Sequence, residues 1–149
     1  MRHVTGVKPA GEWMAGDAAT VTLAFDDRHR RRIKLTDDAG AEFLLDLAEA
    51  VRLEDGDGLV LDTGGIIAVC AAEEDVLDIT CDNASEIARV AWHIGNRHTP
   101  VQVLPEGTLR IAYDHVLEAM IIGLGAAFER RQAPFSPEPG AYAEGGHGH

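Results

Sequence analysis

Histidine is the residue type in this sequence with the clearest capacity for chemistry. The chain has 149 residues and seven histidines, and a neutral imidazole is a common protein ligand for transition-metal ions. Four of them stand where a ligand could serve: His98 in a loop, His115 at the start of a helix, and His147 and His149 in a glycine-rich terminus. Their type and placement indicate a protein that binds a divalent metal.

His98 is the leading candidate because of its surroundings. It lies just beyond a helix that is expected to end at Gly95, and Pro100 follows two residues later. A short turn next to a proline restricts the backbone, so the imidazole should be held in one direction, as a ligand requires. His93 lies off the apolar stripe of the same helix and is interpreted as a surface residue, or as a donor that supports a ligand.

Helix position also bears on His115. It occupies the first turn of a second expected helix, where the positive end of the helix dipole disfavours a protonated imidazole. The neutral form binds metal, although a histidine in a first turn can equally be an ordinary solvated residue. His147 and His149, carried on glycine-rich sequence, suit loose capture of metal, but such a two-histidine end is weak evidence by itself.

The composition argues against several classes of function. A formal net charge of -12 would repel a phosphate backbone, so no nucleic-acid role is expected, whereas the same charge attracts cations. The longest apolar run, residues 119–125, is shorter than the roughly 20 residues that cross a bilayer. Residues 1–5 also lack a signal-peptide pattern. A cytoplasmic protein without membrane contact is therefore expected.

Two other candidate motifs are interpreted as structural. Cys70 and Cys81 match neither a zinc motif nor a disulfide framework. Both continue an apolar alternation and should be small buried side chains. Residues 55–58 are acidic and glycine-rich but lack the spacing of a calcium loop, so they predict a turn.

The elements that must position the histidines divide the chain in two. In residues 1–72, short segments with an apolar residue at every second position alternate with turn sequences, which is typical of a small β-barrel or sandwich. The clearest segments are residues 21–25, 33–35, 43–47 and 59–61.

Residues 73–133 predict the order strand, helix, strand, strand, helix, strand, which is that of a ferredoxin-like βαββαβ domain. The first helix has Asn83 as its N-cap, with Glu86 three residues on, and Gly95 as the left-handed residue that ends it. The second helix follows Asp114 and is apolar nearly all round, so a second subunit is expected to cover one side.

Residues 134–149 are rich in proline and glycine and have few large apolar side chains, so they predict a disordered, flexible His-containing tail. The fold class is therefore α+β. Its expected parts are an N-terminal β domain (1–72), a ferredoxin-like domain for metal binding and dimerisation (73–133), and the tail (134–149).

Two segments of the second half resemble a known family. Residues 95–100 read GNRHTP and residues 114–118 read DHVLE. At this separation, they resemble the C-terminal domain of the UreE family of urease accessory nickel metallochaperones. Residues 30–38 and 53–57 look like the family's N-terminal domain, so the likeness covers most of the chain.

The resemblance implies both a function and a site. It implies a protein that is not an enzyme, that binds Ni²⁺ through one His98 from each subunit of a homodimer, and that has His115 as a peripheral ligand. It also implies delivery of nickel to the urease apoprotein through an accessory GTPase, with the N-terminal domain binding a partner or peptide. Two dimers could share a metal, and zinc or copper could bind the same imidazoles, which do not by themselves select nickel.

The chain departs from the family's pattern in two places. Tyr113 stands where some relatives have another histidine, and the tail is poor in histidine, so fewer peripheral sites are expected. Asn96, Arg97, Tyr113 and Asp114 are retained as residues that could orient or support the ligands.

Two rival hypotheses come from other classes of function. A metallohydrolase could use His98, His115 and Asp114 with a water, but no catalytic motif accompanies them and Asp114 is explained as a helix cap. A peptide- or partner-binding adaptor of an assembly complex, without metal, could use a sheet edge of the β domain and dock an acidic partner on Arg28, Arg30, Arg31 and Arg32. Such a charge cluster is more often a solvated turn.

Overall fold

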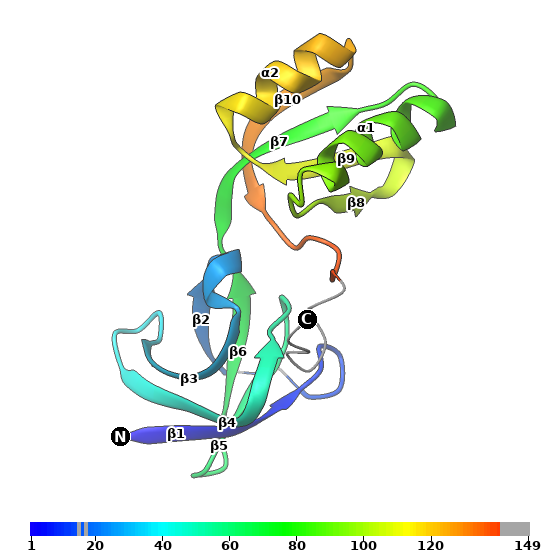
Figure 1. Ribbon diagram of the computed structural model, residues 1–149. Helices are drawn as coiled ribbons and strands as arrows, with labels where there is room; N and C mark the ends of the chain where they lie inside the picture. The colour runs from blue at the N-terminus through cyan, green and yellow to red at the C-terminus, as the bar shows by residue number, and fades with distance from the viewer. Residues whose placement is uncertain (15, 17, 141–149) are drawn as a thin grey trace. The chain divides into compact units, whose positions relative to one another are not determined.

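The structure is a computed structural model that describes residues 1–14, 16 and 18–140. The chain forms two compact units, residues 1–72 and 73–140, and each is built on one β-sheet (Figure 1). The class is α+β, as the sequence predicted.

The first unit is a curled six-stranded sheet with the strand order β2-β6-β5-β1-β4-β3. In chain order its elements are β1 (Arg2–Lys8), β2 (Ala19–Leu23), the 3-10 turn η1 (Phe25–Asp27), β3 (His29–Thr36), β4 (Glu42–Arg52), β5 (Gly58–Leu61) and β6 (Ile66–Ala71). The pairs β1–β4 and β2–β6 are parallel, and the other neighbours are antiparallel. Alternate residues of the strands point inward, so Phe43, Leu45 and Leu47 of β4 are all buried in one apolar core.

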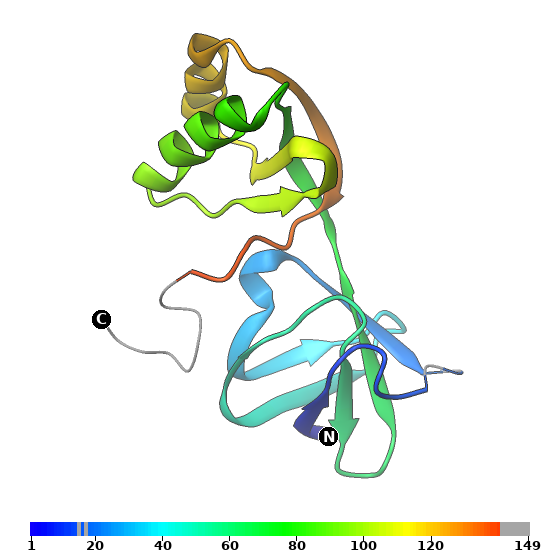
Figure 2. The same cartoon turned by 90° about the vertical axis from the view of Figure 1, so that its right-hand side faces the viewer.

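The second unit has the predicted βαββαβ order. It contains β7 (Glu73–Thr80), α1 (Ala84–Asn96), β8 (Gln102–Leu104), the turn η2 (Pro105–Gly107), β9 (Thr108–Ala112), α2 (His115–Leu124) and β10 (Ala127–Pro134). The sheet order β10-β7-β9-β8, antiparallel throughout, is the ferredoxin-like one. Both helices cover the same face of this sheet (Figures 1 and 2) and share its apolar core.

Local capping explains where the two helices begin. Asn83 accepts a hydrogen bond from the amide of Glu86, and the Glu86 carboxylate accepts one from the amide of Asp82, both at 2.9 Å. Asp114 caps α2 by accepting hydrogen bonds from the amides of Val116 and Leu117, and Gly125, with φ of 75°, ends the helix. These contacts satisfy amides and carbonyls that a helix end otherwise leaves unpaired, and both N-caps confirm the sequence prediction.

Three elements differ from the sequence analysis. β1 was not predicted, and Phe25 begins a 3-10 turn instead of ending a strand. β10 reaches Pro134, which the sequence assigned to the tail. Residues 135–140, assigned to the tail from sequence, belong to the second unit: Phe135 is only 2% exposed, and the amide of Glu138 donates to the carbonyl oxygen of Val101 at 2.8 Å.

Among the described residues, none of the helices has the length and apolar character needed to cross a membrane.

Candidate metal centre

The end of α1 places His98 in an unusual backbone conformation. The amide of His98 donates to the carbonyl oxygen of Gly95 at 2.9 Å, and the amide of Thr99 donates to that of Ile94 at 3.3 Å. This pair of hydrogen bonds is the Schellman motif, whose left-handed position is usually a glycine. Here it is His98, with φ of 58°.

The prediction that Gly95 would be the left-handed residue is therefore wrong. Gly95 lies inside α1, which continues to Asn96, and Arg97 follows as its C-cap. A non-glycine residue in the left-handed region costs about 1–2 kcal/mol, because its Cβ crowds the neighbouring carbonyl oxygen. Residues with backbone strain of this kind are found most often at functional sites. His98 is also exposed, so its imidazole is open to solvent.

His115 is the first residue of α2 and is exposed. The residue before it, Asp114, is committed to its capping role: one carboxylate oxygen accepts from the amides of Val116 and Leu117 at 2.8 and 3.0 Å. These hydrogen bonds, led by that from Leu117, lower the pKa of Asp114, and the charges of His115 and Arg97 add to the effect.

α1 and α2 contribute to one apolar core on the same face of the sheet, and the charge of Arg97, which follows α1, is a minor cause that lowers the pKa of Asp114 at the start of α2. Asn96 and Arg97, which precede His98 in the chain, are also exposed.

Tyr113, which the sequence suggested as a residue that could support the ligands, packs against Arg130 and Glu118. The guanidinium of Arg130 lies 3.6 Å from the centre of its ring, and its hydroxyl donates to Glu118 at 3.3 Å. Burial and the nearby Glu118 carboxylate raise the pKa of Tyr113. A neutral, packed phenol is a poor metal ligand, so Tyr113 is better explained as structural support for the start of α2.

His93 is half-buried on α1 and meets the ring of Trp92 edge-to-face, with the ring centroids 5.0 Å apart. This contact suits the interpretation of His93 as a surface residue.

His147 and His149 lie outside the described residues. Within the described part of the chain, no three His, Cys, Asp or Glu side chains gather where they could hold a metal ion, and the rival set of His98, His115 and Asp114 is thus no such cluster.

The arginine run is not one continuous docking surface. Arg28 is 0% exposed and donates to the carbonyl oxygen of Leu23 at 3.0 Å. Arg30 pairs with Asp27 at 3.1 Å. Only Arg31 and Arg32 are exposed, so the hypothesis that all four arginines meet an acidic partner is wrong for Arg28.

Cys81 is buried, as the sequence predicted, whereas Cys70 is only half-buried, and neither forms a disulfide. Burial is the main cause that raises the pKa of both thiols. A thiol with a raised pKa is a poorer metal ligand than a free one, because the thiolate is the binding form.

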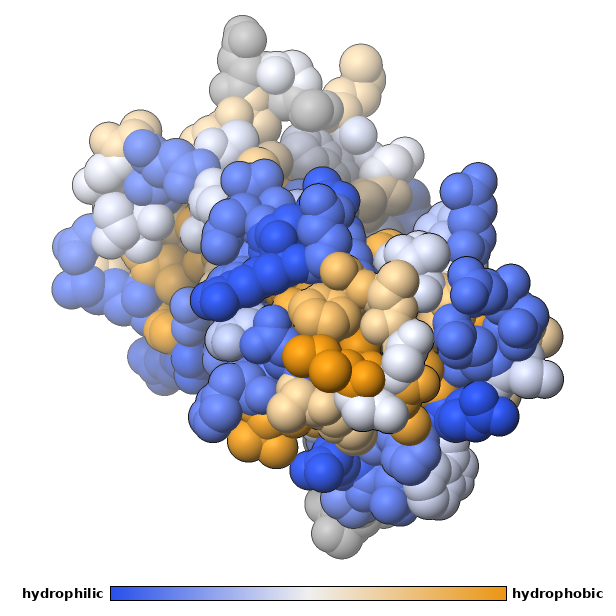
Figure 3. Space-filling view, turned by 90° about the horizontal axis from the view of Figure 1, so that it is seen from above, coloured by the Kyte–Doolittle hydropathy of each residue, from blue (hydrophilic) through white to orange (hydrophobic). Residues whose placement is uncertain are grey.

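One side of α2 is apolar and exposed among the residues that the structure describes. Val116 is 48% exposed and Ile122 is 61% exposed, and Ala119 and Gly123 are exposed between them. Figure 3 shows apolar side chains bordered by hydrophilic ones on the face seen from above. The sequence predicted that α2 would be covered on nearly all sides, and in the described part of the chain this side stays exposed.

These features define a class of protein: a two-unit α+β chain whose candidate ligands are histidines presented at helix ends. Comparison with known proteins identifies the family. Residues 2–72 match the UreE urease accessory protein, N-terminal domain, and residues 74–149 match the UreE urease accessory protein, C-terminal domain.

Full-length relatives agree with this match. The urease accessory protein UreE of Bradyrhizobium sp. (strain ORS 278) is 49% identical over 149 residues, covering 100% of this chain and 70% of that protein. UreE of Beijerinckia indica is 45% identical over 100% of this chain and 86% of its own length. UreE of Rhodobacter capsulatus is 46% identical over 100% and 94%. The chain belongs to the UreE family of urease accessory proteins, which are not enzymes.

Proposed function

We propose that this protein binds Ni²⁺ through His98 and delivers it to the urease apoprotein, acting in the cytoplasm with an accessory GTPase. Family membership supports a role in urease maturation. The resemblance around residues 95–100 and 114–118 supports nickel as the cargo. The accessory GTPase and the apoprotein are the partners that the same resemblance implies.

The observation that carries the proposal is the left-handed backbone of His98. Glycine would relieve the crowding at this position, so the fold alone gives no reason to place a histidine there. A requirement for an exposed imidazole, held by two backbone hydrogen bonds, explains the choice.

A homodimer would complete the site. A single His98 supplies one ligand, whereas two copies related by a two-fold axis supply a pair and leave coordination positions open for transfer. The apolar side of α2 is the surface that a second copy would cover, because Val116 and Ile122 flank the small residues Ala119 and Gly123, over which another helix can pack closely. His115, His147 and His149 would be auxiliary ligands.

The proposal is tested by titrating the metal-free full chain with Ni²⁺ in a calorimeter while measuring the oligomer mass in the same buffer. We expect a tight site at one metal per dimer or per pair of dimers, which His98→Ala removes. His93→Ala, on the same helix, is the matched control and should leave it intact. Deleting residues 147–149 should mainly lower the number of weakly bound metals. Unchanged nickel binding in His98→Ala would overturn the proposal and favour the adaptor without metal.

A further inference from the structure

A short segment after β10 connects the two edges of the second sheet. β10 and β8 are the outer strands of this four-stranded sheet, so three strand spacings, about 14 Å, separate them. β10 ends at Pro134, yet Glu138, only four residues later, is bonded to Val101 just before β8. Residues 134–138 are called the strap below, and their path from β10 towards β8 is visible in Figure 1.

The strap begins on the face of the sheet that the helices leave open. Arg110 stands between the core residues Leu109 and Ile111 of β9, so its side chain points away from the helices. Its guanidinium donates to both carboxylate oxygens of Asp78, at 2.7 and 2.9 Å, and to the carbonyl oxygen of Pro134 at 2.9 Å. The Arg110 and Asp78 side chains are only 11% and 10% exposed. A charged, two-pronged pair thus fixes the start of the strap.

The far end of the strap is bonded to the outer edge of β8. The amide of Ser136 donates to the side-chain oxygen of Gln102 at 2.9 Å. Glu138 makes two further bonds: its amide donates to the carbonyl oxygen of Val101 at 2.8 Å, and its carboxylate accepts from the amide of Val103 at 3.2 Å. These are backbone groups that a neighbouring strand would otherwise pair. Glu138 therefore takes the place of a further strand at this point.

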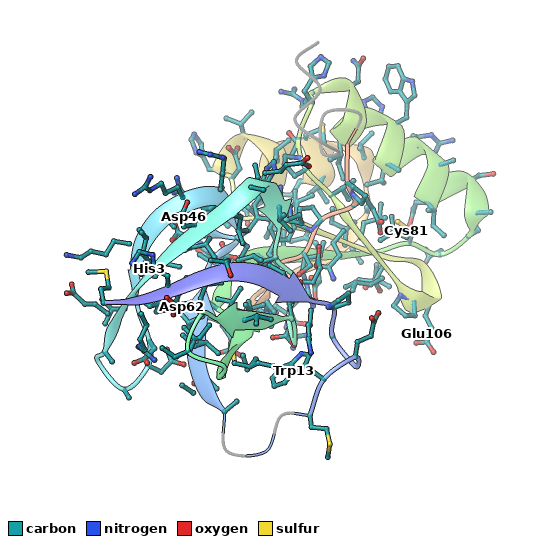
Figure 4. The ribbon with its side chains drawn as sticks, turned by 90° about the horizontal axis from the view of Figure 1, so that it is seen from below. His3, Trp13, Asp46, Asp62, Cys81 and Glu106 are labelled. Carbon is teal, nitrogen blue, oxygen red and sulfur yellow. The ribbon has the colours of Figure 1, made fainter. Side chains whose placement is uncertain are left out.

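This anchoring decides where the chain continues beyond the strap. Val101 follows His98 by three residues, a backbone span of at most about 11 Å. The opposite end of β8 leads into the turn with Glu106, which is labelled in Figure 4. The strap therefore meets β8 at the end that adjoins the loop with His98, and the residues after Glu138 start from there.

The distance along the chain suits a contact with that loop. His147 and His149 follow Glu138 by nine and eleven residues, and nine residues can span up to about 30 Å. A tether that started at Pro134 would have thirteen residues to His147 and would begin about 14 Å from β8, at the other edge of the sheet. Because effective concentration falls as a tether lengthens, anchoring at β8 makes encounters with His98 more frequent.

We propose that Glu138, together with Gln102, is a positioning residue: it anchors the strap so that Ni²⁺ captured by His147 or His149 is passed quickly to His98. In this step Ni²⁺ exchanges one neutral imidazole for another, and no proton or electron is transferred. The inference rests on the proposed function, since it takes His98 as the tight ligand. It concerns the speed of loading, and the number of metals held tightly at equilibrium stays the same.

The strap is tested first in the metal-free full chain, by hydrogen exchange of the Val103 amide measured by NMR. Glu138→Ala removes the carboxylate that accepts from this amide, so exchange should become at least about tenfold faster. Glu138→Gln keeps an oxygen acceptor and should exchange close to the parent rate. Glu129→Ala, at an exposed glutamate of β10, is the matched control. Unchanged exchange in Glu138→Ala would overturn the proposal.

Positioning is tested next by the rate of nickel loading. The metal-free full chain is mixed with the nickel–murexide complex, and the loss of the complex's absorbance gives the rate. Gln102→Ala combined with Glu138→Ala should slow loading by about threefold, and deletion of residues 147–149 should slow it equally. Joining these changes should slow it no further. Gln132→Ala combined with Glu129→Ala changes the same residue types, both exposed on β10, and should load at the parent rate.

Two results would contradict the positioning role. One is a parent loading rate in the Gln102→Ala and Glu138→Ala protein. The other is a slowing that adds to that of the deletion, because a residue with a merely structural role would act independently of the histidines. The proposed function fails by a different result, a tight nickel site that persists in His98→Ala, and the exchange of the Val103 amide is measured without nickel. The two proposals can therefore fail separately.

Discussion

The amide nitrogen of His98 lies 2.9 Å from the carbonyl oxygen of Gly95, and this hydrogen bond closes α1 with a histidine in the left-handed conformation. The two residues have exchanged the roles that their types suggest. Gly95, free to be left-handed, is helical, and His98, which is crowded in that conformation, is left-handed. The arrangement gives up some stability at the position where the metal ligand is proposed.

Replacing His98 separates stability from binding. His98→Gly and His98→Ala both remove the imidazole, so both should lose the tight nickel site. The metal-free His98→Gly protein should nevertheless be more stable than His98→Ala by about 1 kcal/mol, because alanine keeps the Cβ that crowds the left-handed backbone. Urea unfolding of both metal-free proteins measures the difference. A His98→Ala protein as stable as His98→Gly would mean that the backbone at residue 98 is not held left-handed.

The site could be predicted in part. The loop after α1 and the capping role of Asp114 could be predicted because they depend on residues close in sequence, and the metal ligands themselves stay a prediction. The left-handed residue could not, because glycine is the usual signal for a helix end, whereas α1 extends past Gly95 with Ile94 buried in the core beneath it. Packing against the sheet, which sequence periodicity does not measure, decides where this helix stops.

In the fold as well, the features that depend on local sequence could be predicted, and those that depend on pairing between distant segments could not. The N-caps of α1 and α2 are local, and both agree with the sequence prediction. β1 has few alternating apolar residues, and its pairing partner β4 lies about forty residues further along the chain, so only non-local pairing defines it. β10 extends to Pro134 because its polar residues pair with β7 along its whole length; its sequence, with Arg130 and Arg131, lacks an apolar pattern.

The exposed side of α2 should govern dimerisation. Ile122→Glu places a charge on the apolar face, and in a two-fold dimer the two copies would carry like charges into the same interface. We expect the dimer to dissociate, with a dissociation constant raised by about a hundredfold or more, as measured by analytical ultracentrifugation. Met14→Glu changes an apolar side chain that is 93% exposed in the first unit, and it should leave the dimer unchanged. A dimer that survives Ile122→Glu would place the interface elsewhere.

Close packing around Gly58 should make even a small side chain harmful. A Cβ atom there would lie 2.8 Å from the Trp13 indole and 2.9 Å from a methyl group of Ile66. Gly58→Ala should therefore displace the indole, lower the unfolding free energy by about 1–3 kcal/mol and shift the Trp13 fluorescence. The open glycine Gly64 is unsuitable as a control because its φ is 101°, so Gly140→Ala serves instead and should be close to neutral. An unchanged emission spectrum in Gly58→Ala would contradict the packing described.

Tyr113 should prove dispensable for metal binding. Its hydroxyl lies 3.3 Å from the Glu118 carboxylate, and its ring stacks on Arg130. Tyr113→Phe keeps the stacked ring and removes the only oxygen of the side chain that could bind a metal. Nickel stoichiometry and affinity, measured by calorimetry, should equal those of the parent chain. A weaker tight site in Tyr113→Phe would instead make the phenol oxygen part of the coordination sphere.

The capping carboxylate of Asp114 should make the stability of α2 depend on pH. Its pKa in the folded chain is lowered from the ordinary value of 3.8, mainly by the hydrogen bond from the amide of Leu117. The stabilisation is therefore complete above that ordinary value and is lost as the pH falls through the lower, folded value.

Asp114→Asn keeps an oxygen that can cap the helix but has no charge to interact with its dipole. The parent should be more stable than Asp114→Asn at about pH 6, and the two should converge towards about pH 3, as followed by urea unfolding at each pH. A stability difference that stays constant across this range would show that the carboxylate acts only through its shape.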